Sequence, residues 1–259
     1  MLELANLNSE INGMTWQELS EALKRSDIAI LPVGSVEQHG PHLPLSSDQI
    51  VPMEIARRVA KRINALIAPI IPWGDEWAFI FKEWRTGTFH LRPETMINLV
   101  EDICNSLIGN GLKKIIIING HGGNPPHISL AAEKVVLKTG AKILAVNWWM
   151  LHSKVTSEVK ESKWEIHAGE LETSVVLAAR PDLVHMDRAV AEIPKMPYMT
   201  YPDNWSGGDN IGYLYPVGVN VSASGVFGDP SKASKEKGEK IIDAVVENIV
   251  TFVEREWRR

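Results

Sequence analysis

Short apolar runs alternate along the chain with segments of helical periodicity. Buried-strand patterns occupy residues 28–33, 66–71, 113–118 and 142–147. Apolar spacings of three and four predict helices over residues 48–63, 92–108, 125–138, 170–179 and 232–254. Strands that alternate with crossover helices favour a parallel sheet covered on both faces. We therefore predict an α/β fold with three αβα layers and a mostly parallel central sheet.

The chain has 259 residues, a length that one α/β domain commonly spans. It contains no internal repeat or linker-like tract, so we predict a single domain over residues 1–259. Residues 190–228 are rich in Pro, Gly, Asn and Tyr and show little periodicity. A long irregular stretch of this kind is either a functional loop region or an oligomer contact.

Composition excludes several classes of protein. The single cysteine rules out an intramolecular disulfide framework and a cysteine-based zinc ribbon. A formal net charge of -5 gives no electrostatic reason to bind nucleic acid. The chain carries neither a signal-peptide pattern nor a run of about 18 apolar residues. We therefore expect a soluble cytoplasmic protein with no nucleic-acid or membrane partner.

Polar residues that directly follow the strands are the candidate site residues, because parallel sheets bind ligands beyond their carboxyl ends. Glu37 and His39 follow the first strand and are two positions apart, so an extended backbone turns both to one side. Asp48 returns at the expected N-cap of the next helix. Carboxylate and imidazole together suit a divalent transition metal. The alternative is a surface loop with a capping aspartate.

A second cluster, Asn-Gly-His-Gly-Gly-Asn over residues 119–124, follows the strand at 113–118. Gly120, Gly122 and Gly123 surround His121 and allow the backbone to approach a bound group closely. The alternatives are a tight turn or an anion-binding turn before the next helix. A phosphate-binding Walker loop is excluded, because the Gly-Lys-Ser/Thr ending is missing.

The third cluster, His-Ala-Gly-Glu-Leu-Glu-Thr-Ser over residues 167–174, starts a helix. A helix beginning near Gly169 turns Glu170 and Ser174 to one face and Glu172 about 200° away. The alternative is a helix N-terminus that is merely enriched in acids, which the helix dipole favours.

These segments together resemble the creatininase (creatinine amidohydrolase) family, on residues 32–44, Asp48, residues 119–124 and residues 167–174. The resemblance implies an α/β two-metal hydrolase that acts on a small molecule and is commonly a homohexamer built of dimers. It also implies that Glu37, His39, Asp48 and His121 are metal ligands. Asp48 would bridge the two ions, with Glu37 and His121 on one ion and His39 on the other.

The sequence departs from creatininase at one ligand. Creatininase has a glutamate two positions after the histidine that matches His121, whereas this chain has Gly123. Glu172 is our candidate for the replacement, and the helical phase makes Glu170 its rival. His167 matches the histidine that creatininase is thought to use for proton transfer. We therefore predict His167 and Glu172 as catalytic residues.

The implied cofactor is a pair of divalent metal ions, with Zn²⁺ preferred and Mn²⁺ or Fe²⁺ as alternatives. Such a pair makes water reactive near neutral pH and polarises a carbonyl group. A serine nucleophile is disfavoured, because Ser35 lacks the Gly-x-Ser-x-Gly pattern. Cys104 lies in a helical apolar pattern that favours packing over catalysis.

Nine tryptophans are many for this length, and most follow the strands. We predict that Trp77, Trp148 and Trp164, together with Gly122 and Gly123, bind the substrate. An aromatic wall suits a flat ring. The alternative is packing in the core or between subunits.

The predicted activity is hydrolysis of a cyclic amide or another small non-peptide C–N bond through a metal-bound hydroxide. Alternatives within the same family are C–C hydrolysis of a cyclic diketo-sugar, as in 3-dehydro-scyllo-inosose hydrolase, formamide deformylation and peptide trimming. Residues 73–85 depart from the pattern expected of creatinine-acting members. The non-enzyme alternative is a metal-binding subunit without catalysis.

Overall fold

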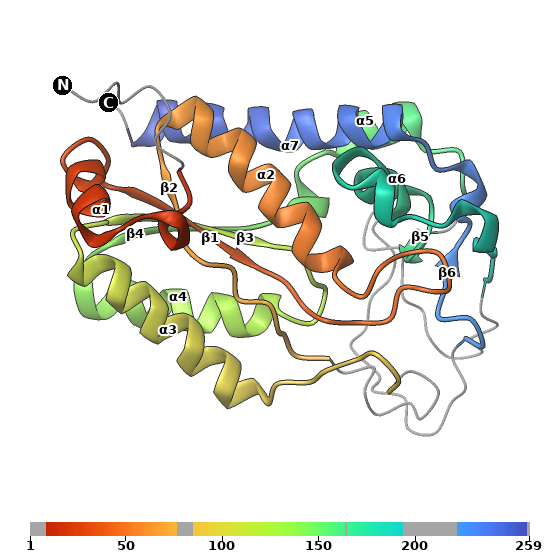
Figure 1. The fold of residues 1–259 in the computed structure, drawn as a ribbon, viewed down its shortest axis with the longest axis horizontal. Coiled ribbons are helices and arrows are strands. Elements are labelled where there is room, and N and C mark those ends of the chain that lie inside the picture. The colour runs from red at the N-terminus through yellow and green to blue at the C-terminus, as the bar shows by residue number, and fades with distance from the viewer. Residues whose placement is uncertain (1–8, 77–84, 164, 194–221, 258–259) are drawn as a thin grey trace.

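The computed structural model describes residues 9–76, 85–163, 165–193 and 222–257. Its main sheet has four parallel strands in the order β2-β1-β3-β4 (Figure 1). A small antiparallel pair, β5 and β6, lies apart from it. The strands are β1 (Ile28–Val33), β2 (Leu66–Ile67), β3 (Lys114–Asn119), β4 (Lys142–Asn147), β5 (Glu165–His167) and β6 (Phe227–Gly228). The predicted mostly parallel sheet is confirmed.

Helices cover both faces of the main sheet, which confirms the three αβα layers. One layer contains α2, α6 and α7, and the other contains α3 and α4 (Figure 1). The helices are α1 (Trp16–Leu23), α2 (Ser47–Ile63), α3 (Pro93–Gly109), α4 (Pro125–Thr139), α5 (Ser153–Val159), α6 (Glu170–Ala179) and α7 (Lys235–Glu256).

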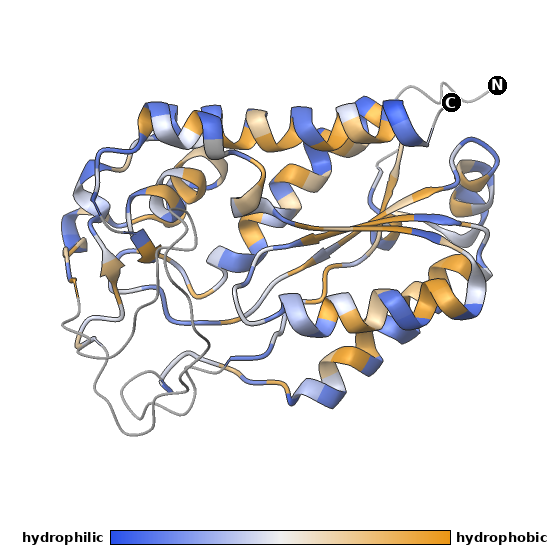
Figure 2. Cartoon of the chain, turned by 180° about the vertical axis from the view of Figure 1, so that it is seen from behind, coloured by the Kyte–Doolittle hydropathy of each residue, from blue (hydrophilic) through white to orange (hydrophobic). Residues whose placement is uncertain are grey.

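Alternation along the central strands explains why both faces are covered. Ile116 and Ile118 of β3 pack in the core under α2, α6 and α7. Ile115 and Ile117 pack in the opposite core under α3 and α4. Successive side chains of a strand point to opposite faces, so a continuous apolar run requires a cover on each side. Figure 2 shows hydrophobic residues along the strands and on the helix faces turned toward them.

The end of β2 and the start of α2 differ from the sequence-based expectation. The strand predicted over residues 66–71 ends at Ile67, with a single further bridge from Ile71 to Val33. The Ala68 N–H still bonds to the Ile30 carbonyl oxygen, but the next bond to β1 comes from Ile71, three residues later, so the register shifts across Pro69. The N-cap of α2 is Ser46, so the prediction that Asp48 caps this helix is wrong. Asp48 lies inside the first turn, and its side chain is turned to other partners.

The strand ends and the start of α2 are packed very closely together. Val33 of β1 is paired with Asn119 of β3, so the two strands end at the same level. A Cβ atom at Gly120, directly after β3, would lie 2.0 Å from the Asp48 carbonyl oxygen. Only glycine allows this approach. The close packing brings Asp48 to the carboxyl edge of the sheet.

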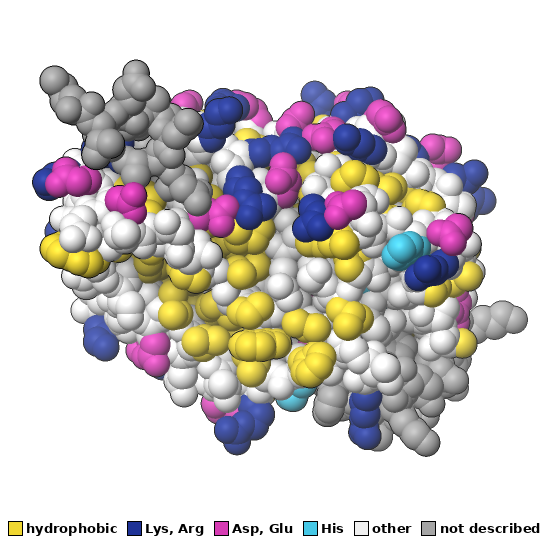
Figure 3. Space-filling view, viewed as in Figure 1, with side chains coloured by type: hydrophobic (Ala, Val, Ile, Leu, Met, Phe, Trp, Pro, Cys, Tyr) yellow, Lys and Arg dark blue, Asp and Glu magenta, His cyan; other side chains and the backbone are white. Residues whose placement is uncertain are grey.

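The surface seen in Figure 3 combines an apolar and a charged region. Hydrophobic side chains gather over the middle of this face, whereas charged side chains are concentrated along its upper edge. Apolar patches on a protein surface commonly mark contacts with other molecules.

Among the described residues, no helix is long and apolar enough to cross a membrane.

Candidate metal centre

The segment after β1 brings Glu37 and His39 to one buried position. Both side chains are almost fully buried. The His39 ring nitrogen Nδ1 lies 3.1 Å from the Glu37 carbonyl oxygen, and Nε2 lies 3.1 Å from Oδ1 of Asp48. One ligand atom of the Glu37 side chain also lies within 4.8 Å of one of His39, so the two side chains point to the same side of the segment, as their spacing predicts.

Asp48 lies between two imidazoles. Its Oδ1 faces His39, whereas its Oδ2 lies 2.9 Å from Nδ1 of His121. Ser35 donates its hydroxyl to the same Oδ2 atom at 2.7 Å. Each carboxylate oxygen thus faces a different histidine, which is the arrangement that a bridging carboxylate requires.

His121 is fixed by the turn that follows β3. Asn119 accepts the His121 backbone N–H and donates its amide to the His121 carbonyl oxygen. The second ring nitrogen of His121, Nε2, lies 3.1 Å from the Asp75 carbonyl oxygen. A backbone carbonyl of this kind orients an imidazole and selects which nitrogen faces a metal. His39 has the same arrangement through the Glu37 carbonyl.

The two glutamates at the start of α6, Glu170 and Glu172, have different partners. Glu172 lies close to His39 and Asp48, and its Oε2 accepts the Ala168 backbone N–H at 2.5 Å. Glu170 is turned away, toward Lys237 Nζ at 2.6 Å and the backbone N–H groups of Glu161 and Ser162. The structure therefore places Glu172, and not its rival, in the cluster.

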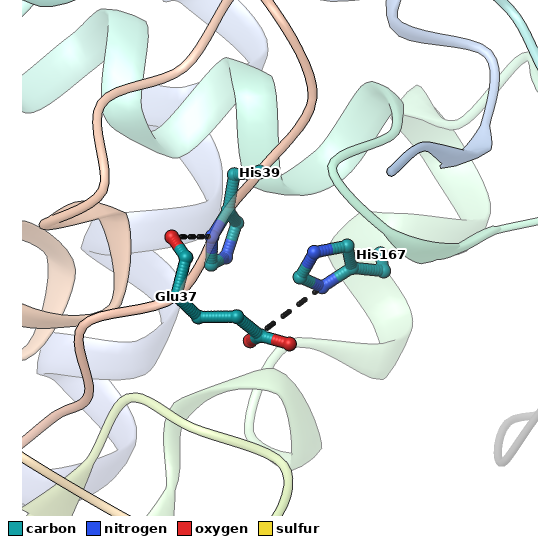
Figure 4. Close-up of side chains that lie close together, drawn as sticks. All are labelled: Glu37, His39 and His167. Atoms are coloured by element: carbon teal, nitrogen blue, oxygen red, sulfur yellow. Dashed lines mark hydrogen bonds and ion pairs between the residues drawn. The ribbon is translucent and has the colours of Figure 1, made fainter. Parts of the chain in front are cut away.

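His167 stands at the edge of the cluster. Its Nε2 lies 2.9 Å from the Gln38 carbonyl oxygen, and its Nδ1 lies 4.0 Å from Oε2 of Glu37. Its ring is 4.2 Å from the ring of His39, centroid to centroid. Figure 4 shows His167 beside Glu37 and His39, which come together from the segment after β1. The His167 side chain is 12% exposed, so its ring borders both the cluster and solvent.

The charges of these neighbouring groups shift one another's pKa values. Burial alone would lower the pKa of His39, but the charge of Asp48 and the hydrogen bond to it raise that pKa to about 10. Burial also opposes the charged form of His121, whose pKa is nevertheless raised by Glu76, Asp48 and Glu37. Burial would raise the pKa of Asp48, yet His39 and His121 hold it below its usual range. A cation placed here would therefore replace protons on the imidazoles.

Sequence reasoning missed Glu76. This residue follows the β2 segment and is 1% exposed, beside Glu37, Asp48 and His121. Burial, together with the charges of Glu37 and Asp48, raises the pKa of its carboxyl well above the usual range. Its position after a strand is the same signal that identified the other clusters.

The structure describes three of the five predicted substrate-binding residues, and two of these three are packed against other groups. Trp148 is 3% exposed and packs against Trp149 and His152 in the core. Trp77 and Trp164 lie outside the described residues. Gly122 has open space where a side chain would project, whereas Gly123 lies against the Asp75 backbone.

The donor groups fit a pair of divalent cations. Glu37, Asp48, Glu76 and His121 form one group, and His39, Asp48 and Glu172 form another. Within each group, one ligand atom per residue lies within 4.8 Å of the others. Carboxylate oxygens and imidazole nitrogens are the ligands that Zn²⁺ and Mn²⁺ take. Asp48 belongs to both groups.

Known proteins resemble this chain over nearly its whole length. Creatinine amidohydrolase of Pseudomonas putida is 28% identical over 95% of this chain and 96% of its own length. The 3-dehydro-scyllo-inosose hydrolase of Thermotoga maritima is 29% identical over 93% of this chain and 81% of its own.

The solved structures that resemble this chain include several creatininases. A mutant creatininase complexed with creatine has a TM-score of 0.83 and 26% identity, covering 98% of this chain and 100% of that one. Similar creatininase structures include a Zn-Zn type and a manganese form. The family model for creatininase, described as creatinine amidohydrolase, matches residues 12–253. The chain therefore belongs to the creatininase family.

Proposed function

We propose that this protein is a metal-dependent hydrolase that binds two divalent ions around Asp48 and hydrolyses a cyclic amide or another small non-peptide C–N bond. The observation that carries the proposal is the position of Asp48, whose two oxygens face His39 and His121 at 3.1 and 2.9 Å. Bound there, a pair of ions would supply Lewis acidity and a reactive water near neutral pH. Zn²⁺ is the preferred metal, with Mn²⁺ or Fe²⁺ as alternatives.

The two donor groups divide the ligands between the ions. Glu37, Asp48 and His121 would hold one ion, and His39, Asp48 and Glu172 would hold the other. The backbone carbonyls of Glu37 and Asp75 take the remaining N–H of His39 and His121. These hydrogen bonds leave the nitrogens that face Asp48 available to the ions.

His167 is the proposed proton carrier. Its Nε2–H donates to the Gln38 carbonyl, so Nδ1 is left facing Glu37 and the cluster. A histidine at this edge reaches both the reacting bond and solvent, and it can pass a proton to the leaving nitrogen. The Ala168 N–H holds one oxygen of Glu172 and thereby orients the carboxylate. Trp77, Trp164 and Gly122 remain the proposed substrate contacts, whereas Trp148 packs in the core and Gly123 lies against the Asp75 backbone.

A second candidate activity is C–C hydrolysis of a cyclic diketo-sugar. The 29% identity with the Thermotoga maritima hydrolase over 93% of the chain favours it. The same donor groups would polarise a ring ketone as well as an amide carbonyl. We also propose a cytoplasmic homo-oligomer, a hexamer by family resemblance, and the apolar area in Figure 3 supports subunit contacts.

Removal of metal tests whether the protein is a metal-dependent enzyme. We expect dialysis against a chelator to abolish turnover in a panel of cyclic amides, formamides and cyclic ketones. Adding back Zn²⁺, Mn²⁺ or Fe²⁺ should restore it, because the donor groups persist in the folded chain. Activity that survives with no bound metal would contradict the proposal. A protein that binds metal yet turns over nothing in the panel would support the non-catalytic alternative.

Glutamine variants at the start of α6 test the ligand assignment. We expect Glu172→Gln to lower the occupancy of one ion, because its carboxylate lies beside His39 and Asp48. Glu170→Gln should keep both ions, since that carboxylate is bound to Lys237 and to backbone N–H groups. Elemental analysis of both purified proteins measures the difference. The reverse ranking would assign the ligand to Glu170.

A further inference from the structure

We propose that Glu76 is a ligand of the ion held by Glu37, Asp48 and His121. This inference rests on the proposed function and adds a residue to its metal centre. Glu76 comes from the segment after β2, which the ligand motifs do not include. Its carboxylate lies within 4.8 Å of ligand atoms from all three neighbours.

Among the residues that the structure describes, no hydrogen bond accounts for the burial of the Glu76 carboxylate. Glu76 is 1% exposed, and neither Oε1 nor Oε2 accepts a hydrogen bond within the described residues. The only hydroxyl hydrogen of Ser35 is donated to Asp48. Nε2 of His121 is 3.3 Å from Oε1, but its N–H points to the Asp75 carbonyl. A buried carboxylate in such a position is costly unless it is paired or binds a metal.

The backbone is arranged to bring Glu76 here. A Cβ atom at Gly123 would lie 2.0 Å from the Asp75 carbonyl oxygen and 2.7 Å from Nε2 of His121. Any side chain at position 123 would therefore displace the backbone segment that carries Glu76. The Asn124 side chain accepts the Asp75 N–H at 3.1 Å and fixes the same segment. The absence of a side chain at position 123 thus allows the backbone to place Glu76 beside His121.

Charge balance supports the same conclusion. The two donor groups contain the carboxylates of Glu37, Asp48, Glu76 and Glu172. Four ionised carboxylates neutralise two divalent cations that carry a neutral water, whereas three do so only once that water has become hydroxide. Neutral clusters of this kind avoid the cost of burying a net charge.

Titration of the metal-free protein with Zn²⁺ tests the assignment. We compare the wild type, Glu76→Gln and Glu170→Gln, using a chromophoric chelator as competitor to count ions and measure the affinity of each. Glutamine keeps the shape and an acceptor oxygen, so a merely structural contact with His121 would survive. We expect Glu76→Gln to bind one ion as the wild type does and the other at least about tenfold more weakly. Glu170→Gln, a buried carboxylate outside the cluster, should match the wild type.

Co²⁺ in place of Zn²⁺ provides a readout besides affinity, because its visible absorption reports changes in its ligands. We expect the Glu76→Gln spectrum to change and the Glu170→Gln spectrum to stay the same. If Glu76→Gln does not fold by circular dichroism, Glu76→Asp, which keeps the charge but shortens the side chain by one methylene group, should weaken binding of the same ion and leave the other unchanged. Two ions of wild-type affinity in Glu76→Gln would overturn this inference alone. A wild-type protein that takes up no Zn²⁺ would overturn the proposed function as well.

Discussion

Replacing Asp48 with alanine is expected to abolish binding of both ions and to reduce turnover by about 10³-fold or more. Asp48 is the residue shared by the two donor groups, so its loss removes a ligand from each. Metal ions contribute several kcal/mol to stabilising a hydrolytic transition state, and each 1.36 kcal/mol is tenfold in rate. Elemental analysis and steady-state kinetics of the purified variant measure both effects.

The fold should survive this substitution. Asp48 lies in the first turn of α2, where an acid contributes about 0.3–1 kcal/mol through the helix dipole. Without its charge the pKa values of His39 and His121 fall, and buried neutral imidazoles cost little. Asp182→Ala is the control, because Asp182 pairs with Arg180 at the surface. An Asp48→Ala protein that keeps two ions at wild-type affinity would contradict the bridging role.

Much of the sheet was predictable because its signals are local. The strand bounds 28–33 and 142–147 match β1 and β4, since apolar runs flanked by polar residues mark both ends. The prediction for residues 66–71 failed after Ile67 because the register against β1 shifts across Pro69, although the apolar pattern continues. Periodicity reports burial, whereas a strand ladder also needs backbone hydrogen bonds at regular spacing.

Prediction of the metal-ligand cluster from the sequence was limited in a different way. The rule that ligands follow parallel strands predicted that segments after β1 and β3 would meet, and Glu37, Asp48 and His121 do lie together. The choice between Glu170 and Glu172 depends on which face of α6 packs against α7, which helical phase alone cannot decide. Glu76 was missed because its approach depends on the space beside Gly123, which lies against the Asp75 backbone 48 positions away along the chain.

Binding of two Zn²⁺ ions at pH 7 is expected to release at least about two protons, which makes the overall affinity rise about 100-fold per pH unit. In the metal-free protein each of the two imidazoles has an acceptor at both nitrogens. His39 faces the Glu37 carbonyl and Asp48, whereas His121 faces Asp48 and the Asp75 carbonyl. Only the doubly protonated imidazolium satisfies both contacts.

The direction of the pH effect follows from the pKa values. The pKa of His39 is raised to about 10, so this ring is charged at pH 7, and the charges of Glu76, Asp48 and Glu37 raise the pKa of His121 and favour its charged form. An ion at the nitrogen facing Asp48 must displace a proton, and protons therefore compete with metal as the pH falls. Calorimetric titrations in buffers of different ionisation enthalpy count the protons released.

His42→Gln provides the control for this experiment. Burial lowers the pKa of His42 to about 4, so this ring is neutral at pH 7 and has no proton to lose. Its Nε2 lies 2.9 Å from the hydroxyl of Thr173, and His42 belongs to neither donor group. The variant should release as many protons as the wild type. If the wild type binds two ions without releasing protons, the metal does not bind at the nitrogens that face Asp48, and the ligand assignment for both histidines fails.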